Sequence, residues 1–453
     1  MPPPSRKGLY FSAFVLFAVN ILNFYDRHVP GALTEPIRKE FHLSDTQVGL
    51  LGSIFIWLYA IVGVPLGRIA DTASRKKLLA AAVTVWAALT ASAALAGSFA
   101  MLLISRVGVG LGEAGCAPAA TSWLGDLFPP DRRSRVLALF MLGVPVGGAL
   151  SFFFSGPIAQ AYGWRASMAL AAAPALVLVP ALLLLREPAR GASEPRAASD
   201  SRSSTANPSL AGDSVWAILR IPTLWWIIAS GVLLNFNAYS IASFLPALLS
   251  RVHRLSLAAS GVASGIVYIF GGVIGGALAG VLGDSIVRRR KDGRLRIASL
   301  ASLLAAPLAC LAILQPAGAI FAAVFFFALT YAALTSYYGL VYSAIQDLVA
   351  PNQRGTTMAV YFLAMYLCGA SFGPLLTGRL SDLLARHAAT LAGSATVTEI
   401  FRALGLQRAM LEIPVLSAVL AMVLYLGSRS MLTDVARREA LPVRSDSLGE
   451  LAP

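Results

Sequence analysis

The stretch GRIADTASRK, residues 67–76, decides the architecture of this chain when it is compared with GVLGDSIVRR, residues 280–289. Each stretch follows a long apolar segment. Each also places a glycine, an aspartate four residues later and a basic pair in the same order. A hydrophilic motif that recurs after equivalent apolar segments indicates a duplicated unit.

Two further matches support the duplication. They stand at nearly the same spacing and in the same order: Leu22-Asn23-Phe24 with Leu234-Asn235-Phe236, and Asp126-Leu127 with Asp347-Leu348. Any one match could arise by chance. Together they predict two six-helix units in parallel orientation that face each other across a central cavity.

The amino-acid composition indicates that these helices are surrounded by lipid. The 453 residues are 57% hydrophobic and only 13% charged, and the mean hydropathy is +0.71. A helix needs about 20 apolar residues to cross a bilayer, and twelve such segments can be placed along the chain. We therefore predict an all-α integral membrane protein with twelve transmembrane helices in two pseudo-symmetric six-helix bundles.

Charge distribution predicts how the chain is oriented. The net charge is +14, but most Lys and Arg lie in alternate loops, as expected for cytosolic loops rather than for nucleic-acid binding. The predicted location is a cell membrane, in bacteria the inner membrane, with both termini cytoplasmic. The predicted division is a first bundle, a cytosolic linker with an interfacial helix, a second bundle and a cytosolic tail: residues 1–186, 187–222, 223–432 and 433–453.

A family resemblance rests on these motifs. The pattern Gly67-x3-Asp71-x3-Arg75-Lys76, with its repeat near residue 284, resembles the signature loop of the major facilitator superfamily. The resemblance implies a cytosolic gate between the halves formed by Asp71, Arg75, Asp284 and Arg288.

A narrower resemblance lies in the first half. RVGVGLGEA at residues 106–114, GDLF at 125–128 and NFYDR at 23–27 are similar to the Spinster family. This resemblance implies alternating-access transport of a lysophospholipid or a sphingosine-1-phosphate-like lipid, coupled to protons and without a cofactor. The expected partners are the amphipathic substrate, protons and the lipid bilayer, with no nucleic acid and no obligate protein partner.

Four buried charges are the candidate coupling residues. Ionised side chains inside a membrane are costly and usually functional, and Asp26, Arg27, Arg106 and Glu113 lie within apolar segments. We expect Asp26 and Glu113 to carry protons, and Arg106 to bind an anionic group and to alternate between it and a carboxylate. Arg27 is a further candidate for substrate binding, whereas a purely structural role would pin the first helix to the fourth.

The opposite wall is predicted to be apolar and aromatic. At the equivalent positions of the second half, the charged residues are replaced by Ala238, Tyr239, Phe327 and Leu334. A cavity charged on one side suits an amphipathic molecule. The other candidate substrate-binding residues are Tyr25, Asn23, Asn235, Asn237, Tyr239, Tyr337 and Tyr338.

Other functions are less well supported by the sequence. A transporter of a small polar organic anion, such as a sugar acid, could use Arg106 and Glu113 in the same way and remains the alternative. The four histidines are scattered and the three cysteines are isolated, so neither a metal site nor an enzyme is predicted. A Gly-rich phosphate loop ending in Lys-Ser or Lys-Thr is also missing, which argues against direct use of ATP.

Overall fold

The described residues form helices joined by short turns and loops, with no strand among them. The computed structural model describes residues 6–190, 192–193, 218–287, 290, 292–349 and 353–440. Ten helical stretches in these ranges are long and apolar enough to cross a membrane. One of them, Arg135–Leu184, has 50 residues, which is enough for two crossings. The helix Arg75–Ala93, which is apolar after its basic first turn, provides one more. The described residues therefore contain the twelve crossings predicted from the sequence.

The first half contains six crossings built from nine helices. In chain order these are α1 (Arg6–Ala32), α2 (Thr34–Glu40), α3 (Asp45–Thr72), α4 (Arg75–Ala93), α5 (Phe99–Glu113), α6 (Cys116–Leu127), α7 (Pro130–Met141), α8 (Gly143–Ala172) and α9 (Ala175–Leu184). The fourth crossing joins α5 to α6. The fifth and sixth meet within α8 at Gly163, whose φ of 85° breaks the helix and is a backbone conformation that glycine adopts without strain.

The second half repeats this arrangement with longer helices. They are α12 (Pro222–Val252), α13 (Leu257–Val287), α14 (Gly293–Ile313), α15 (Ile320–Leu348), α16 (Arg354–Ala364), η2 (Met365–Ala370), α17 (Phe372–Leu391), α18 (Glu399–Ala409) and α19 (Glu412–Ala440). The eleventh crossing is interrupted by the π-helical turn η2, a local irregularity of a kind often found at functional sites. The last helix continues to Ala440, past the end predicted at residue 432.

Local sequence explains where several helices begin. Ser44 and Gln47 form a reciprocal capping box at the start of α3, and Ser74 and Ser98 cap α4 and α5 through their side chains. Such caps satisfy backbone N–H groups that the helix itself cannot pair. Pro222 opens α12 at a position where a missing N–H costs nothing.

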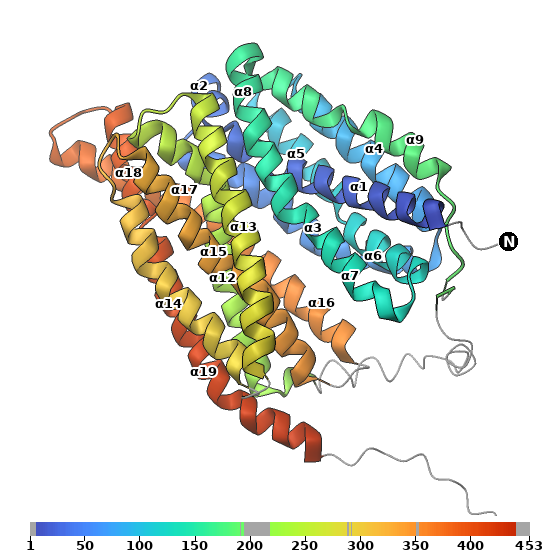
Figure 1. Ribbon diagram of the computed structural model, residues 1–453. Helices are drawn as coiled ribbons and strands as arrows, with labels where there is room; N and C mark the ends of the chain where they lie inside the picture. Colours follow the sequence, from blue (N-terminus) through green and yellow to red (C-terminus); the bar gives the residue numbers. More distant parts are fainter. Residues whose placement is uncertain are drawn as a thin grey trace, which may run out of the picture.

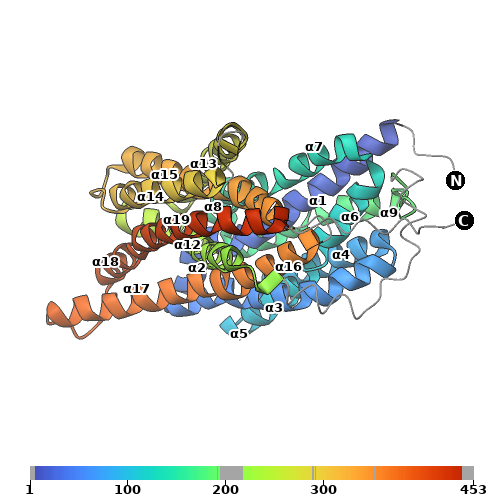
Figure 2. The ribbon, with the colours of Figure 1, turned by 90° about the horizontal axis from the view of Figure 1, so that it is seen from below.

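The two halves lie side by side, and three pairs of helices make most of the contacts between them. These pairs are α8 with α13, α3 with α17, and α1 with α12, as Figures 1 and 2 show. Glycines allow the close approach: a Cβ on Gly49 would lie 2.1 Å from the Pro374 carbonyl oxygen, and one on Gly378 would lie 2.1 Å from that of Asp45. We call this region, formed by α2, the first turns of α3 and the last turns of α12, the closed end.

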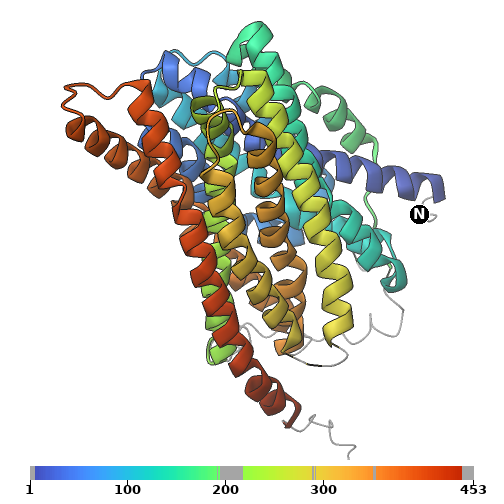
Figure 3. The same ribbon diagram turned by 60° about the vertical axis from the view of Figure 1, so that its left-hand side comes forward.

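The opposite end of the molecule carries the first residues of α1, the α3–α4 junction and the last residues of α19, and we call it the terminal end. In Figure 3 the red α19 extends along the second half toward this end. Most of the predicted linker, residues 194–217, lies outside the described residues, as does the tail from residue 441 onward.

Candidate functional site

The candidate site is centred on a buried ion pair between α1 and α5. Arg27 Nη2 lies 3.1 Å from Glu113 Oε2, and the exposed fractions of the two side chains are 3% and 0%. Asn23 Oδ1 also accepts from Arg27 Nη2, at 3.4 Å. Each charge therefore compensates the other inside the membrane, and removing either one would leave an isolated buried charge.

Arg27 also links the two halves. Its Nη1 donates to the hydroxyl of Tyr239 on α12 at 3.4 Å. Its guanidinium lies 4.4 Å from the ring centre of Tyr59 and 4.7 Å from that of Phe24, distances typical of cation–π contacts. A change in the charge of Glu113 would therefore directly affect the contact of Arg27 with Tyr239, which joins the two halves.

Asp26 has a different partner. Thr90 of α4 donates its hydroxyl to Asp26 Oδ2 at 2.6 Å, while Asp26 Oδ1 has no hydrogen-bond partner. Adjacent residues on an α-helix point about 100° apart, so Asp26 and Arg27 face different neighbours. This explains why Asp26 bonds α4 while Arg27 approaches α5.

Arg106 is not paired with a carboxylate in this structure. It makes no ion pair among the described residues, and its Nε and Nη1 atoms are buried without a hydrogen-bond partner. Its guanidinium lies 5.0 Å from the ring centre of Phe55. In this structure Arg27 pairs with Glu113 and Thr90 bonds Asp26, so neither carboxylate is paired with Arg106. The alternation of Arg106 between an anionic group and a carboxylate stays a prediction.

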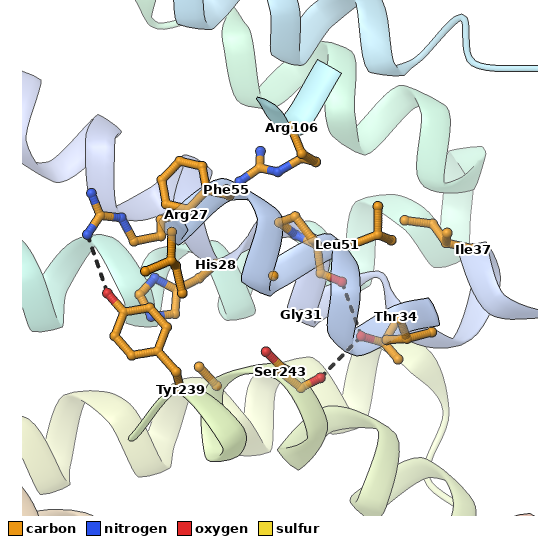
Figure 4. Close-up of a pocket in the computed structure, with 15 residues that line it drawn as sticks. Arg27, His28, Gly31, Thr34, Ile37, Leu51, Phe55, Arg106, Tyr239 and Ser243 are labelled. Atoms are coloured by element: carbon orange, nitrogen blue, oxygen red, sulfur yellow. Dashed lines mark hydrogen bonds between the residues drawn. The ribbon is translucent and has the colours of Figure 1, made fainter. Parts of the chain in front are cut away.

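A small cavity brings both arginines together. Its volume is about 30 Å³, which is room for water but not for a lipid. Figure 4 shows Arg27 and Arg106 on either side of Phe55, with Tyr239 and Ser243 contributed by α12. The lining residues are Arg27, His28, Pro30, Gly31, Thr34, Ile37, Val48, Leu51, Gly52, Phe55, Ile56, Arg106, Tyr239, Ala242 and Ser243.

His28 is a lining residue that sequence analysis did not single out. Its Nδ1 lies 2.7 Å from the Phe24 carbonyl oxygen, so Nδ1 carries the proton of the neutral ring and Nε2 is the acceptor. The ring packs edge-on against Phe152 and Tyr268, where the halves meet. In the sequence, only its position directly after Asp26 and Arg27 indicated that His28 could belong to the site.

The other predicted contact residues divide into two groups. Tyr239 lines the cavity, and Tyr25 lies 3.3 Å from Ser155 Oγ through its hydroxyl. Asn235 accepts from Tyr338 at 3.3 Å and donates to the Met365 sulfur in η2 at 3.3 Å.

Two more of the predicted residues pack, like Asn235 and Tyr338, within the second half. Asn237 donates to Ser417 of α19 at 3.1 Å, and Tyr337 is bonded to Ser230 at 2.7 Å and to Tyr361 at 3.0 Å. Neither lines the cavity. Both positions were chosen for polarity, which in a membrane helix also serves to bond neighbouring helices.

The closed end contains a network that the sequence did not predict. Arg251 of α12 donates to both oxygens of Asp45 at 2.8 Å and to Glu35 of α2 at 2.7 Å. Arg38 of α2 donates to Glu399 of α18 at 2.7 Å. These ion pairs cross from one half to the other, so they hold the closed end together.

Of the four residues predicted to form the gate, only Arg75 has a described side chain, and it lies at the terminal end. Arg75 is buried and pairs with Asp126 and Glu187, both in its own half. Arg294, at the start of α14, pairs with Asp347 in the second half. Arg288 and the side chains of Asp71 and Asp284 lie outside the described residues, so no latch that includes them can be described.

Glu187 caps the start of α4. Its carboxylate accepts from the Ser74 hydroxyl at 2.6 Å and from the Arg75 backbone N–H at 2.9 Å. Burial alone would raise the pKa of Glu187, but these hydrogen bonds hold the pKa below its ordinary value. The ionised form is therefore favoured in the folded protein, and its contribution to stability is lost as the pH falls through that lowered pKa.

Comparison with known proteins agrees with this architecture. The profile of the Major Facilitator Superfamily matches residues 16–374, so the chain belongs to this superfamily of membrane transport proteins. It is 32% identical over 374 residues to an MFS-type efflux pump of Mycolicibacterium smegmatis, covering 82% of this chain and 84% of the pump.

The other relatives are Spinster proteins. Human protein spinster homolog 1 is 29% identical over 402 residues, which is 85% of this chain and 75% of the human protein. A bacterial homolog of the human lysosomal transporter Spinster, solved in an inward-facing and unoccupied conformation, is 26% identical, with a TM-score of 0.84 over 95% of this chain and 99% of that one. Within the superfamily, this chain is a Spinster-type transporter.

Proposed function

We propose that this chain transports an amphipathic anion, of the lysophospholipid or sphingosine-1-phosphate class, by alternating access in a cycle coupled to protons. The observation that carries the proposal is Arg106, a buried guanidinium with unpaired donor atoms beside the cavity. The planar guanidinium suits a phosphate, to which it can donate two parallel hydrogen bonds. The efflux pump of M. smegmatis among the relatives supports export as the direction.

The proposed coupling uses the ion pair between Arg27 and Glu113. A proton on Glu113 removes its charge and so releases Arg27, which then joins Arg106 in holding the anionic head group. Loss of that proton restores the ion pair and weakens the hold on the anion. Asp26, which is bonded only by Thr90, is the second proton carrier in this scheme.

The apolar part of the substrate is assigned to the second half. Tyr239, Ala242 and Ser243 line the cavity from α12, and the positions equivalent to the buried charges are uncharged. A cavity of about 30 Å³ must enlarge to admit such a molecule. In this scheme the halves separate at the terminal end, which we assign to the cytoplasm of a bacterial cell, while the closed end faces outward.

The test is transport by the purified protein in proteoliposomes with a proton gradient. A fluorescent lysophospholipid and radiolabelled gluconate, a sugar acid, would be assayed in parallel, with and without the gradient. Gradient-dependent movement of the lysophospholipid alone would support the proposal. Movement of gluconate alone would overturn the substrate class, in favour of a small polar anion at the same two arginines.

A further inference from the structure

A second pocket lies outside the central cavity, between α12, α17 and α19. Its volume is about 510 Å³, within the range of pockets that bind small organic molecules. Eight of its nine lining residues are apolar: Val232, Leu233, Phe236, Leu376, Leu380, Leu411, Val415 and Leu416. The ninth is a carboxylate, Glu412, and all nine belong to the second half. None of the residues of the buried charge cluster takes part.

The pocket opens toward the lipid. Leu376 is 43% exposed and Val415 is 62% exposed, and in a membrane-spanning chain such side chains contact acyl chains. Within the second half, α12 contacts both α17 and α19. A hydrophobic molecule dissolved in the bilayer could therefore enter the pocket sideways, without passing through the central cavity.

Glu412 is the feature that an ordinary lipid-facing surface would lack. Its Oε1 contacts the Thr377 hydroxyl, while its Oε2 accepts no hydrogen bond from any described residue. It also has no ion-pair partner there, unlike Glu113 in the central site and Glu35 and Asp45 at the closed end. An ionised group at the lipid boundary is costly unless a cation compensates it, and no arginine or lysine lines the pocket.

Helix directions place the carboxylate inside the apolar lining. On α17, Leu380 lies nearer to the closed end than Thr377, which contacts Glu412, because Ser381 bonds Asp45 there. On α19, Glu412 is the first residue, and Val415 and Leu416 follow toward the terminal end. Apolar side chains therefore lie on both sides of the carboxylate.

We propose that this pocket binds a hydrophobic ammonium compound, with the cationic nitrogen at Glu412 and the apolar body against the leucines of α17 and α19. The occupant is opposite in charge to the anion assigned to the central cavity. The two sites share no lining residue, so the pocket does not depend on the proposed function. Its charge complementarity rests on Glu412, which has no ion-pair partner among the described residues.

The experiment is photolabelling of the purified transporter in nanodiscs with three benzophenones of matched shape. They are 4-benzoylbenzyl-trimethylammonium, neutral 4-benzoylbenzyl alcohol and anionic 4-benzoylbenzoate. Labelled peptides would be assigned by mass spectrometry. We expect the ammonium to label peptides of α12, α17 and α19 at least five times more strongly than the alcohol, and the benzoate to label them least.

Two variants and a matched control complete the test. Glu412→Gln should reduce ammonium labelling to the level of the alcohol, while Leu416→Trp, which fills the pocket, should reduce labelling by both. Glu113→Gln removes a carboxylate elsewhere and should leave labelling of this pocket unchanged. Equal labelling by all three probes would identify an ordinary lipid-facing surface, and no labelling by any probe would indicate a covered face. Either result, or full ammonium labelling of Glu412→Gln, would overturn the proposal.

Discussion

The two halves of the molecule are alike at their terminal end and unlike in their interior. Arg75 at the start of α4 pairs with Asp126, Arg294 at the start of α14 pairs with Asp347, and each pair joins neighbouring helices of its own half. Around the central cavity, only the first half contributes charged lining residues. The duplication therefore preserves the ion pairs that support the helices, while the polar chemistry of the cavity belongs to one half.

The interior difference has a physical consequence. Arg27, Arg106, Asp26 and Glu113 are all buried, yet only Arg27 and Glu113 pair with each other. Facing them, α12 offers the hydroxyl of Tyr239. One wall can therefore change its charge state while the other stays neutral, which is the asymmetry an amphipathic substrate requires.

The largest effect is expected where charges from both halves meet. Arg251→Ala would leave the buried Asp45 without its cation and would remove one of the two cations of Glu35, which also pairs with Arg38. Breaking a buried pair costs about 3–5 kcal/mol. The closed end should separate more readily. Spin labels at Lys39 and Ala395, in a variant without the three native cysteines, should show longer distances in pulsed electron paramagnetic resonance. Unchanged distances would contradict a closing role for this network.

A smaller effect is expected at the matched pairs of the terminal end. Arg75→Ala removes hydrogen bonds to Asp126 and Glu187, and charged hydrogen bonds are each worth about 1.5–3 kcal/mol. Arg294→Ala should cost less, because its side chain is 14% exposed and that of Arg75 only 1%. Thermal unfolding in detergent would measure both variants. A larger loss of thermal stability in Arg294→Ala than in Arg75→Ala would show that the burial of the arginine does not determine the size of the effect.

The charged wall should bind the anion through Arg106. Arg106→Ala is expected to weaken lysophospholipid binding by about 10-fold to 100-fold, the equivalent of one lost charged hydrogen bond. Arg165→Ala is the matched control, because Arg165 lies near the surface and pairs with Glu40. Thermal stabilisation by the lipid measures both. Equal stabilisation of the two variants by the lipid would contradict the role of Arg106 in binding the anion.

The neutral wall should contribute less. Tyr239→Phe removes only the hydroxyl that accepts from Arg27, and a single such hydrogen bond contributes about 0.5–1.5 kcal/mol. Substrate affinity should change by no more than about 10-fold, in the same stabilisation assay. A loss as large as that of Arg106→Ala would mean that the polar chemistry is shared between the halves.

The sequence predicted the crossings and the duplication because apolar length and repeated motifs are local properties. It also identified the four buried charges, since ionisable residues in apolar segments are conspicuous. It did not predict their pairing. Depth along a helix follows from counting residues, but rotation about the helix depends on packing, and this decides that Arg27 rather than Arg106 meets Glu113.

The closed end was missed for a different reason. Asp45 and Arg251 are far apart in the chain, and each alone resembles an ordinary charge at the end of a crossing. Only the contact of the two halves brings them together. The breaks at Gly163 and η2 were likewise hidden, because the surrounding residues are as apolar as those of an uninterrupted helix.

The most direct test of the proposed coupling is the pH dependence of lysophospholipid transport by Glu113→Gln in proteoliposomes. Glutamine keeps the shape of the side chain but cannot ionise, so Arg27 should stay released at every pH. Transport by this variant should vary much less with pH, because only Asp26 can still exchange a proton, while Glu40→Gln, at an exposed carboxylate of α2, should keep the normal profile. A pH profile of Glu113→Gln identical to that of the unmodified protein would contradict the role of the Arg27–Glu113 pair.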